Sequence, residues 1–390
     1  MVPSIARELI ACYSAPGDLV YDPFCGSGTT LVEASLTQRR SSGIDLNPLA
    51  VLLSRVKTSP LDPSSIRSDW VLLRSELLRS TASTRWKRAK NPAGRFLDLN
   101  YWYKPYVIRD LGFIRVLIDD RFPDAKDRIG NFMRVALART AREVSNQRKK
   151  EFKRWRLSTA RLRQYRPRPV QVFIEHVEIA RQRMETYYSA TRGRVDCKVA
   201  RKDARTFKLQ RRASLVVTSP PYGDSGTTVA YGQFSSFAME WLGLYQIKPR
   251  RLDVEPTGSV IGRGDCLDLS RRFARSYRRV KRLDADRAHL VLQFFQGMSD
   301  SLDRMRESLK PSAYCCIVVG NRKVRGIDMP TDAILCELAE AVGLELKEVF
   351  GRRVHNKIMP YATKPLNSTG WGPVQSTLRR ESILVFRAIE

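Results

Sequence analysis

The sequence predicts an α/β fold in which a Rossmann-like, mostly parallel sheet of seven strands is interrupted by a large helical insertion. Three observations support this prediction. Residues 19–46 follow the order strand, glycine loop, helix, strand, which is typical of the opening βαβ unit of a doubly wound sheet. Residues 58–195 show helical periodicity without strand alternation. Short apolar strands return from residue 194 onward.

The first part of the sheet domain is predicted over residues 1–57. Apolar residues at helical spacing alternate there with short apolar runs, and breakers such as Pro16-Gly17 separate them. In order, the expected elements are a helix over 4–13, a strand over 19–21, a loop over 22–30, a helix over 31–36, a strand over 43–46 and a helix over 49–56.

The insertion over residues 58–195 is predicted to be helical, with long helices over 127–150 and 169–190. An aromatic cluster, Tyr101-Trp102-Tyr103, lies between predicted helices. Such a cluster can form the core of the insertion, or it can stack on the bases of a nucleic acid. The sequence leaves both interpretations open.

The second part of the sheet domain is predicted over residues 196–390, its first strand beginning at 194. We expect Pro311 to end a long helix and Gly320-Asn321 to form a turn. The segment 224–285 is rich in glycine at first and then strongly basic. The expected strands are 194–200, 214–219, 313–319, 344–354 and 381–388, and the expected helices are 286–309 and 331–342.

The glycine loop, Gly26-Ser27-Gly28, lets the backbone approach a ligand closely, and the helix after it offers unpaired N–H groups. Asp22 and Asp45 end the strands on either side, and an acid there suits paired ribose hydroxyls. The loop lacks the third glycine of the dinucleotide fingerprint and the Gly-Lys-Ser/Thr of a phosphate loop. A nucleoside without phosphates therefore fits better than a pyrophosphate. The alternative is that Asp22 and Asp45 only cap helices.

A further carboxylate, Asp203, follows the third predicted strand, where it would accept a hydrogen bond from an adenine amino group. The candidate cofactor-binding residues are Asp22, Pro23, Phe24, Cys25, Gly26, Ser27, Gly28, Thr29, Asp45, Leu46, Asn47, Asp203 and Ala204. Cys25 is most simply a small packing residue.

A second turn, Thr218-Ser219-Pro220-Pro221-Tyr222, ends the buried strand that contains Leu215-Val216-Val217. Two prolines in a row prevent the strand from continuing, because neither has an N–H group. The turn would present a hydroxyl, backbone carbonyls and an aromatic ring to one small volume. This combination suits a flat ring that carries an amino group, so Ser219, Pro220, Pro221 and Tyr222 are the candidate catalytic residues. The alternative is a rigid loop with Tyr222 packed in the core.

The composition is strongly basic: 69 Lys and Arg stand against 40 Asp and Glu, which gives a formal net charge of +29. A nucleic-acid partner is the natural inference. Residues 147–168 contain ten Lys or Arg and one acid, with Trp155 and Tyr165 interleaved, and residues 271–282 contain no acid. These runs predict phosphate contacts, and the alternative is that they are solvated helix faces.

The sequence has few residues that could form a metal site and no run that could span a membrane. Its seven cysteines form no CxxC pair and it has three histidines, so we predict no metal site and reduced thiols. No apolar run approaches the roughly 18–20 residues of a membrane span, and no signal peptide is evident. The prediction is a cytoplasmic protein without a membrane partner.

At this point two motifs carry a family resemblance. Asp22-Pro23-Phe24-Cys25-Gly26-Ser27-Gly28-Thr29-Thr30 resembles motif I of the S-adenosylmethionine-dependent DNA amino-methyltransferases, and Thr218-Ser219-Pro220-Pro221-Tyr222 resembles their catalytic motif IV. The Ser-Pro-Pro-Tyr form is typical of N4-cytosine enzymes, whereas adenine-N6 enzymes more often have Asp or Asn in place of Ser219. Gly351-Arg352-Arg353-Val354-His355-Asn356-Lys357 resembles a late motif near the target base. Where relatives usually carry an aromatic-proline stretch before motif I, this chain has Met1-Val2-Pro3.

The resemblance implies a methyltransferase sheet, S-adenosyl-L-methionine as cofactor, and double-stranded DNA as partner. It implies a restriction-modification or orphan modification enzyme of the prokaryotic cytosol or nucleoid, with a cognate restriction endonuclease as a possible partner. The region 58–195 would contact DNA or recognise the target, sharing this duty with 224–285. The segment Gly223-Asp224-Ser225-Gly226-Thr227-Thr228 would form a lip over the pocket.

The expected reaction is methylation of the exocyclic N4 amine of a cytosine flipped out of the duplex. Ser219 Oγ and the Pro220 carbonyl would hold the two amino hydrogens, and Tyr222 would stack on the base. No Pro-Cys pair is present, so the covalent route of ring-carbon methylation is not expected. The alternatives are an N6-adenine DNA methyltransferase, an RNA amino-methyltransferase and a non-catalytic basic nucleic-acid-binding protein.

Overall fold

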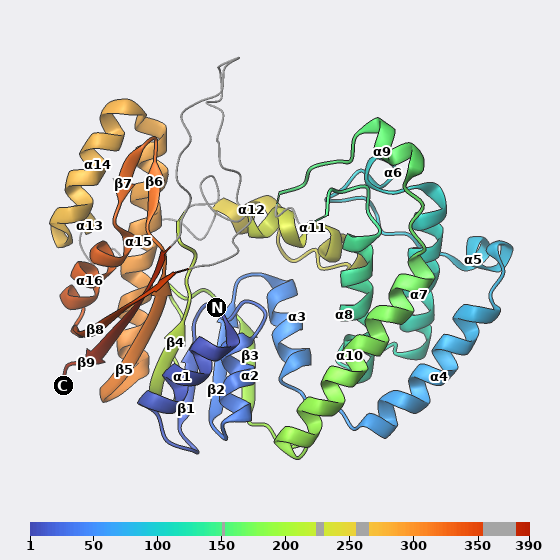
Figure 1. Cartoon of the computed structure of the whole chain (residues 1–390), viewed down its shortest axis with the longest axis horizontal. Helices are drawn as coiled ribbons and strands as arrows, with labels where there is room; N and C mark the ends of the chain where they lie inside the picture. Colours follow the sequence, from blue (N-terminus) through green and yellow to red (C-terminus); the bar gives the residue numbers. More distant parts are fainter. Residues whose placement is uncertain (150–152, 224–229, 255–264, 354–379) are drawn as a thin grey trace. The chain divides into compact units, whose positions relative to one another are not determined.

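A seven-stranded sheet is the central element of the chain, shown in Figure 1 as a computed structural model that describes residues 1–149, 153–223, 230–254, 265–353 and 380–390. The strand order is β3-β2-β1-β4-β5-β9-β8. β4 is parallel to β1 and β5, and β2 is parallel to β3, whereas β9 is antiparallel to β5 and β8. This sheet confirms the predicted Rossmann-like fold class. The strands are β1 Leu19–Asp22, β2 Arg40–Asp45, β3 Cys197–Arg201, β4 Ala213–Thr218, β5 Leu309–Val319, β8 Leu344–Arg353 and β9 Arg380–Ala388.

The chain divides into two compact units. The first unit comprises Met1–Phe24, Lys202–Thr228 and Val254–Glu390, and the second comprises Cys25–Arg201 and Val229–Asp253. The proline turn therefore belongs to the first unit and the glycine loop to the second.

In the first unit, β4 and β5 are buried over most of their length. Such nearly continuous apolar runs are typical of strands covered on both faces. α1 packs against β4 and α15 against β5, and a small hairpin of β6 and β7 follows β5. The further elements are α1 Pro3–Tyr13, α13 Cys266–Leu269, α14 Arg271–Leu283, α15 Ala285–Ser308, β6 Arg322–Val324, β7 Ile327–Met329 and α16 Thr331–Ala341.

β5 begins earlier than predicted. The expected helix over 286–309 ends at Ser308, and the strand starts at Leu309 instead of residue 313. The pairing of β4 with β5 shifts register between Ala213 and Leu215, which face Leu309 and Tyr314. Pro311 and Ser312 lie at this register shift, and Ser312 has a φ of +57°. A bulge tolerates a proline that cannot donate to the ladder, so Pro311 does not delay the strand.

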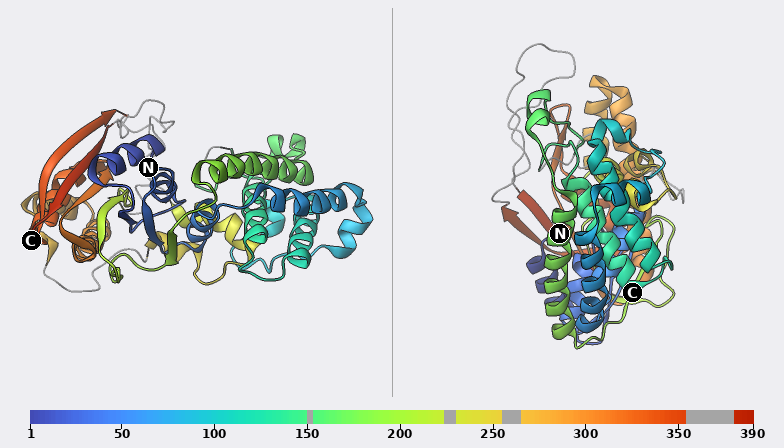
Figure 2. Two further views of the ribbon diagram at one scale, coloured as in Figure 1. Left: turned by 90° about the horizontal axis from the view of Figure 1, so that it is seen from below. Right: turned by 90° about the vertical axis from the view of Figure 1, so that its right-hand side faces the viewer.

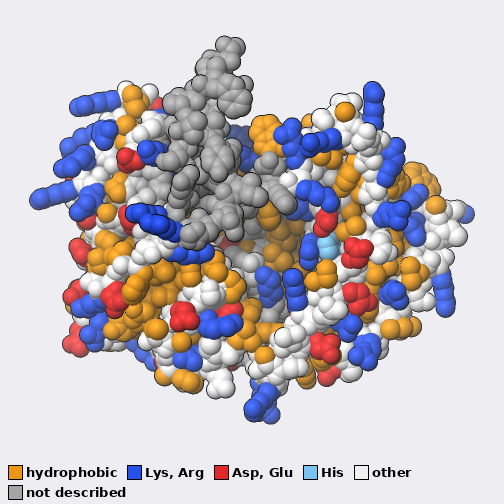
Figure 3. Space-filling model, viewed as in Figure 1, with side chains coloured by type: hydrophobic (Ala, Val, Ile, Leu, Met, Phe, Trp, Pro, Cys, Tyr) orange, Lys and Arg blue, Asp and Glu red, His pale blue; other side chains and the backbone are white. Residues whose placement is uncertain are grey.

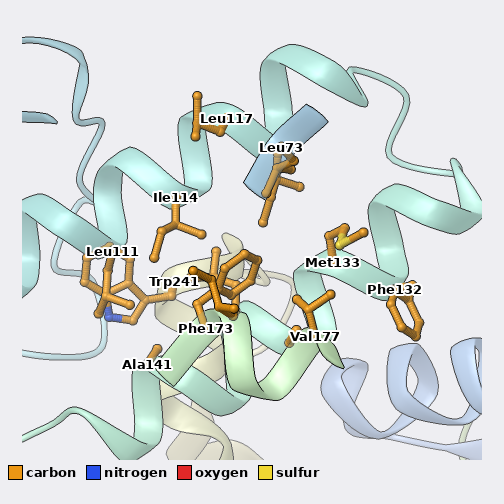
Figure 4. Close-up of a cluster of buried hydrophobic side chains, with 14 of the residues drawn as sticks. Leu73, Leu111, Ile114, Leu117, Phe132, Met133, Ala141, Phe173, Val177 and Trp241 are labelled. Atoms are coloured by element: carbon orange, nitrogen blue, oxygen red, sulfur yellow. The ribbon is translucent and has the colours of Figure 1, made fainter. Parts of the chain in front are cut away.

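The second unit is mainly helical, and α7, α8 and α10 lie side by side in it (Figures 1 and 2). Figure 4 shows its core, where Phe173 and Val177 of α10 meet Trp241 of α11 and Leu111 and Ile114 of α7. Its helices are α2 Thr29–Leu36, α3 Pro48–Lys57, α4 Pro63–Arg79, α5 Ala82–Arg88, α6 Leu99–Trp102, α7 Pro105–Arg121, α8 Arg128–Glu143, α9 Thr159–Gln164, α10 Pro169–Thr191, α11 Tyr231–Leu242 and α12 Pro249–Val254, whose last residue lies in the first unit.

Within the described part of 58–195 the regular elements are helices, as predicted, but α8 ends at Glu143 rather than at 150. The residues after it, Ser145, Asn146 and Gln147, are buried polar side chains. Asn146 N donates to Trp102 O at 2.7 Å, so the chain leaves the helix to bond with α6. This hydrogen bond joins residues far apart in the sequence, so the local helical periodicity could not predict where α8 ends.

Other differences are small. α2 begins at Thr29 rather than Leu31, and β2 covers 40–45 rather than 43–46. The helices α11, α12, α13 and α14 occupy the segment 224–285, for which no helix was predicted. Among the helices of the described residues, none is long and apolar enough to cross a membrane.

Candidate active site and cofactor loop

The proline turn starts from a buried junction between β1 and β4. Thr218 Oγ1, at the end of β4, donates to Asp22 Oδ1 at 2.6 Å. The same oxygen accepts from Phe24 N at 3.1 Å, and the Asp22 side chain is buried. The motif aspartate therefore joins the ends of two parallel strands and starts the loop that follows β1. The structure assigns Asp22 this tertiary role rather than the alternative role of a helix cap.

Ser219 lies at the mouth of the turn and is half-buried. Its Oγ donates to the Val318 carbonyl of β5 at 3.1 Å. Since a hydroxyl has one proton and two lone pairs, Ser219 Oγ has only acceptor capacity left for a ligand. Pro220 and Pro221 have no N–H groups, so at these two positions the backbone offers acceptors and no donors. A ligand amino group matches such a surface.

Tyr222 is tied to β9 through its hydroxyl, which donates to Glu381 Oε1 at 3.2 Å. Arg352 Nη1 pairs with the other oxygen of Glu381 at 3.1 Å. The turn and the first residues of the late motif are thus connected through the carboxylate of Glu381, a residue that no sequence pattern had indicated. Tyr222 is half-buried, so the ring is not a core residue. Val354 to Lys357, and Asp224 to Thr228 of the proposed lip, lie outside the described residues.

The glycine loop, in the second unit, is tightly packed against α3. Gly28 has a φ of +82°, and a Cβ there would lie 2.9 Å from Ser54 Oγ and 3.1 Å from Ser54 Cα. Ser54 Oγ in turn donates to the Gly26 carbonyl at 2.8 Å, and Cys25 Sγ lies 3.7 Å from the same hydroxyl. Cys25 is buried, as expected of a packing residue. Glycine is required at position 28 by both conformation and space.

Asp45 fixes the shape of this loop. Its Oδ2 accepts from Gly26 N at 2.9 Å, and its Oδ1 accepts from Asn47 N at 2.8 Å. Asn47, not Asp45, is the N-cap of α3, and Gly28 occupies the N-cap position of α2. The alternative that Asp45 only caps a helix is therefore wrong. A carboxylate has about four acceptor sites, so these two bonds are compatible with further bonds to ribose hydroxyls.

The remaining cofactor candidates have varied surroundings. Ser27 is exposed, and its carbonyl accepts from Lys57 Nζ at 2.9 Å. Pro23 and Ala204 are buried, and Phe24, Thr29 and Leu46 are half-buried. Asn47 Nδ2 donates to Ser235 Oγ of α11 at 2.8 Å. No pattern in the sequence predicted this contact.

Asp203, in the first unit, is paired with Arg205. Arg205 Nη2 lies 2.7 Å from Asp203 Oδ2, and Arg205 Nε lies 3.1 Å from each carboxylate oxygen. Arg205 N also donates to Oδ1 at 2.9 Å. Arg205 therefore balances the charge of Asp203, and no pattern in the sequence indicated this pairing.

His176 is held by two side-chain hydrogen bonds within the second unit. Buried His176 bonds through Nδ1 to Thr140 Oγ1 at 2.9 Å and through Nε2 to Glu143 Oε2 at 3.0 Å. Burial lowers the pKa of His176, the neighbouring Arg139 adds to this, and Glu143 opposes it. No group of His, Cys, Asp and Glu among the described residues is placed to hold a metal ion.

The basic charge is spread over the surface, with Lys and Arg side chains visible on many parts of the face in Figure 3. In the first unit, α14 carries exposed Arg275, Arg278, Arg279 and Arg282 while its Phe273 is fully buried. In the second unit, Tyr103 of the aromatic cluster is buried and Tyr101 is 45 % exposed. The cluster is thus core at one end and surface at the other.

Comparisons with known proteins find methyltransferases. A family model described as DNA methylase matches residues 3–55. Over 409 residues the chain is 32% identical to the type II methyltransferase M.MvaI of Kocuria varians, covering 99% of this chain and 88% of that protein. It is 21% identical over 444 residues to the type II methyltransferase M.MjaII of Methanocaldococcus jannaschii, covering 91% and 75%. Among solved structures, the rRNA methyltransferase aviRa of Streptomyces viridochromogenes matches with a TM-score of 0.36 and 11% identity, over 99% of this chain and 85% of that chain.

The sheet, the glycine loop and the proline turn define a methyltransferase whose cofactor is S-adenosylmethionine. The chain belongs to the family of type II DNA methyltransferases, since the similarity to M.MvaI extends over nearly all of both sequences. Membership of this family supports DNA rather than RNA as the substrate. It also supports an enzyme rather than a non-catalytic binding protein.

Proposed function

We propose that this DNA methyltransferase modifies the exocyclic N4 amine of cytosine in double-stranded DNA. The observation that carries the proposal is the hydrogen bond from Ser219 Oγ to Val318 O at 3.1 Å. Because the hydroxyl proton is used inside the protein, Ser219 meets a ligand as an acceptor. A hydrogen-bond donor on the target matches this acceptor, and the exocyclic amino groups of cytosine and adenine are such donors.

The chemistry required of the turn is to make a weak nucleophile available. The lone pair of an exocyclic amine is delocalised into the ring. Acceptors at Ser219 Oγ and the Pro220 carbonyl hold the two amino hydrogens and favour a pyramidal nitrogen with a localised lone pair. Positioning and electrostatic complementarity of this kind supply most of the rate in such transfers.

The cofactor is assigned to the glycine loop and its neighbours. Gly26, Ser27, Gly28 and Thr29 offer close backbone approach, and Asp45, with Leu46 and Asn47, offers a carboxylate fixed by Gly26 N and Asn47 N. Bound there, S-adenosylmethionine supplies an electrophilic methyl group. Asp203 and Ala204 complete the proposed set, with Asp203, which also pairs with Arg205, accepting from the adenine amino group.

The choice of cytosine rests on residue 219. A serine at this position is typical of the N4-cytosine enzymes that the Ser-Pro-Pro-Tyr turn resembles, whereas Asp or Asn is more usual for adenine N6. The base has to leave the duplex at a cost of a few kcal/mol, and stacking on Tyr222 returns about 1–3 kcal/mol. We assign the insertion 58–195 and the basic segment 224–285 to DNA contact, and a cognate restriction endonuclease stays a prediction.

Nucleoside analysis tests the choice of base. Duplex DNA is incubated with the purified chain and S-adenosylmethionine, digested to nucleosides and examined by mass spectrometry. We expect N4-methylcytosine. N6-methyladenine as the product would replace cytosine by adenine while leaving the role of the turn intact, and a methylated RNA substrate in a parallel reaction would overturn the assignment to DNA.

A further inference from the structure

A short antiparallel ribbon stands between α8 and α9. We call it the 146–157 ribbon, and its described residues are 146–149 and 153–157. Gln147 and Arg156 form an antiparallel bridge. Arg148 N donates to Trp155 O at 2.7 Å and Leu157 N donates to Asn146 O at 2.8 Å. These bonds make Arg148 and Trp155 directly opposed residues, whose side chains lie on the same face of the ribbon.

The base of the ribbon is fixed to α6. Asn146 N donates to Trp102 O at 2.7 Å, and Asn146 Nδ2 donates to Tyr101 O at 3.0 Å. The Asn146 and Gln147 side chains are buried. The ribbon is therefore a supported projection, which can hold side chains in a defined geometry against a partner.

The two faces of the ribbon differ. Arg154 and Arg156, two residues apart, point to the aromatic cluster: the Arg156 guanidinium lies 4.2 Å from the centre of the Tyr101 ring and that of Arg154 lies 5.7 Å from the centre of the Trp102 ring. Alternation along a strand turns Trp155 to the opposite face. Trp155 is 56 % exposed there, beside exposed Arg148 and Lys153.

An exposed tryptophan that the fold does not use for packing is a candidate contact residue. Of the five tryptophans among the described residues, Trp155 and Trp86 are exposed, and only Trp155 is opposed by an arginine across a ribbon. A two-stranded ribbon fits the major groove of DNA, arginine reads guanine edges, and aromatic rings contact thymine methyls or unstacked bases. The basic helix α14 lacks an exposed aromatic residue, so its charges suit phosphates.

We propose that Arg148 and Trp155 on the 146–157 ribbon contact base pairs of the DNA substrate and set the sequence specificity of methylation. The proposal rests on the DNA methyltransferase function, but it does not depend on which base is methylated. Neither residue lies in the glycine loop or the proline turn, so the variants are not expected to lose the chemistry itself.

The test uses a library of duplexes with a randomised site, methylated by the full chain and sequenced by a method that detects modified bases. The variants are Trp155→Ala, Trp155→Phe and Arg148→Gln, with Trp86→Ala as the matched control. We expect Trp155→Ala and Arg148→Gln each to weaken discrimination at one or more base positions by about tenfold. Trp155→Phe should retain most of the preference. Trp86→Ala, which changes another exposed tryptophan of the same insertion, should leave the order of preferred sequences unchanged.

Sequence preferences of Trp155→Ala and Arg148→Gln identical to that of the unmodified chain would overturn the proposal. A uniform loss of methylation at all sequences would also overturn it, because it would indicate phosphate contact or a general loss of binding. Failure of the proposed function is seen separately: the unmodified chain would then methylate no duplex in the library, or would methylate adenine. In the latter case the comparison of preferences stays valid. Calorimetric binding of S-adenosylmethionine to each variant checks that the fold is intact.

Discussion

The glycine loop after β1 and the proline turn after β4 follow neighbouring strand ends but are held in opposite ways. The loop is closed by side chains from elsewhere in the second unit: Asp45 accepts two backbone N–H groups and Ser54 donates to the Gly26 carbonyl. The turn contains two prolines that remove backbone donors, and its hydroxyl groups bond to Asp22, Val318 and Glu381. A loop built by hydrogen bonds suits tight binding, whereas a turn that leaves acceptors available suits the handling of an amino group. The comparison predicts that cofactor binding and methyl transfer can be separated by mutation.

Removing the carboxylate of Asp45 should have the largest effect on cofactor binding. Asp45→Ala deletes two hydrogen bonds to a charged acceptor, each worth about 1.5–3 kcal/mol, and also the proposed ribose contact. We expect the Kd for S-adenosylmethionine, measured by calorimetry, to rise at least a hundredfold, about 2.7 kcal/mol. Asp45→Asn keeps the shape of the side chain and one acceptor oxygen, so its Kd should lie between those of the unmodified chain and Asp45→Ala. An unchanged Kd for Asp45→Ala would remove Asp45 from the cofactor site.

Crowding at Gly28 should have the next largest effect. Gly28→Ala and Gly17→Ala introduce the same strain, about 1–2 kcal/mol, because φ is +82° at Gly28 and +83° at Gly17. A Cβ at Gly17 meets nothing within 4 Å, whereas one at Gly28 meets Ser54 at 2.9 Å. We therefore expect Gly28→Ala to lose about 1–3 kcal/mol more stability than the control in chemical denaturation. It should also bind the cofactor more weakly. Equal losses in the two variants would show that the contact with Ser54 does not matter.

Changes at Tyr222 should separate its ring from its hydroxyl. Tyr222→Ala removes the proposed stacking surface. We expect kcat/KM for DNA to fall by a factor that corresponds to a loss of about 1–3 kcal/mol of transition-state stabilisation. Tyr222→Phe removes only the bond to Glu381, whose net value is about 1 kcal/mol. Cofactor affinity should be unchanged in both. If Tyr222→Phe reduced kcat/KM as much as Tyr222→Ala does, the bond to Glu381 and not stacking would account for the role of Tyr222.

Charge removal on α14 should have the smallest effect. The double variant Arg275→Gln with Arg279→Gln removes two exposed cations from one helix face. If both contact phosphates, the slope of log affinity against log salt should decrease by about 2, with equal loss on all sequences. Lys323→Gln, which removes a lysine paired with Asp328 at 3.5 Å, is the control and should leave the slope unchanged. A sequence-dependent loss would assign α14 to base contact instead.

The fold could be predicted in large part because its signals are local. The order of strand, glycine loop, helix and strand up to Asn47, and the apolar run that ends at Pro220, each lie within a short stretch of sequence. The contacts that shape the site are not local. Ser219 bonds to Val318 and Tyr222 to Glu381, residues 99 and 159 positions away, and neither partner carries a pattern of its own.

The difference between local patterns and long-range contacts also explains where the predictions from sequence differ from the structure. Pro311 was predicted to end the preceding helix, but that helix ends at Ser308, and the register shift between Ala213 and Leu215 accommodates Pro311 within β5. Arg205 lies two residues from Asp203, yet only the folded backbone shows that it pairs with the carboxylate. Side-chain chemistry at a strand end could be predicted from sequence, whereas the partner of each side chain depends on the tertiary structure.

One pair of measurements on Ser219→Ala tests the separation of binding and transfer most directly. The first is the calorimetric Kd for S-adenosylmethionine, and the second is the single-turnover rate of methyl transfer to duplex DNA. We predict a Kd within about twofold of that of the unmodified chain. The rate should fall by about 10²–10³, the usual cost of one lost contact made in the transition state. A Ser219→Ala variant that methylates DNA at the original rate would contradict the role of the proline turn.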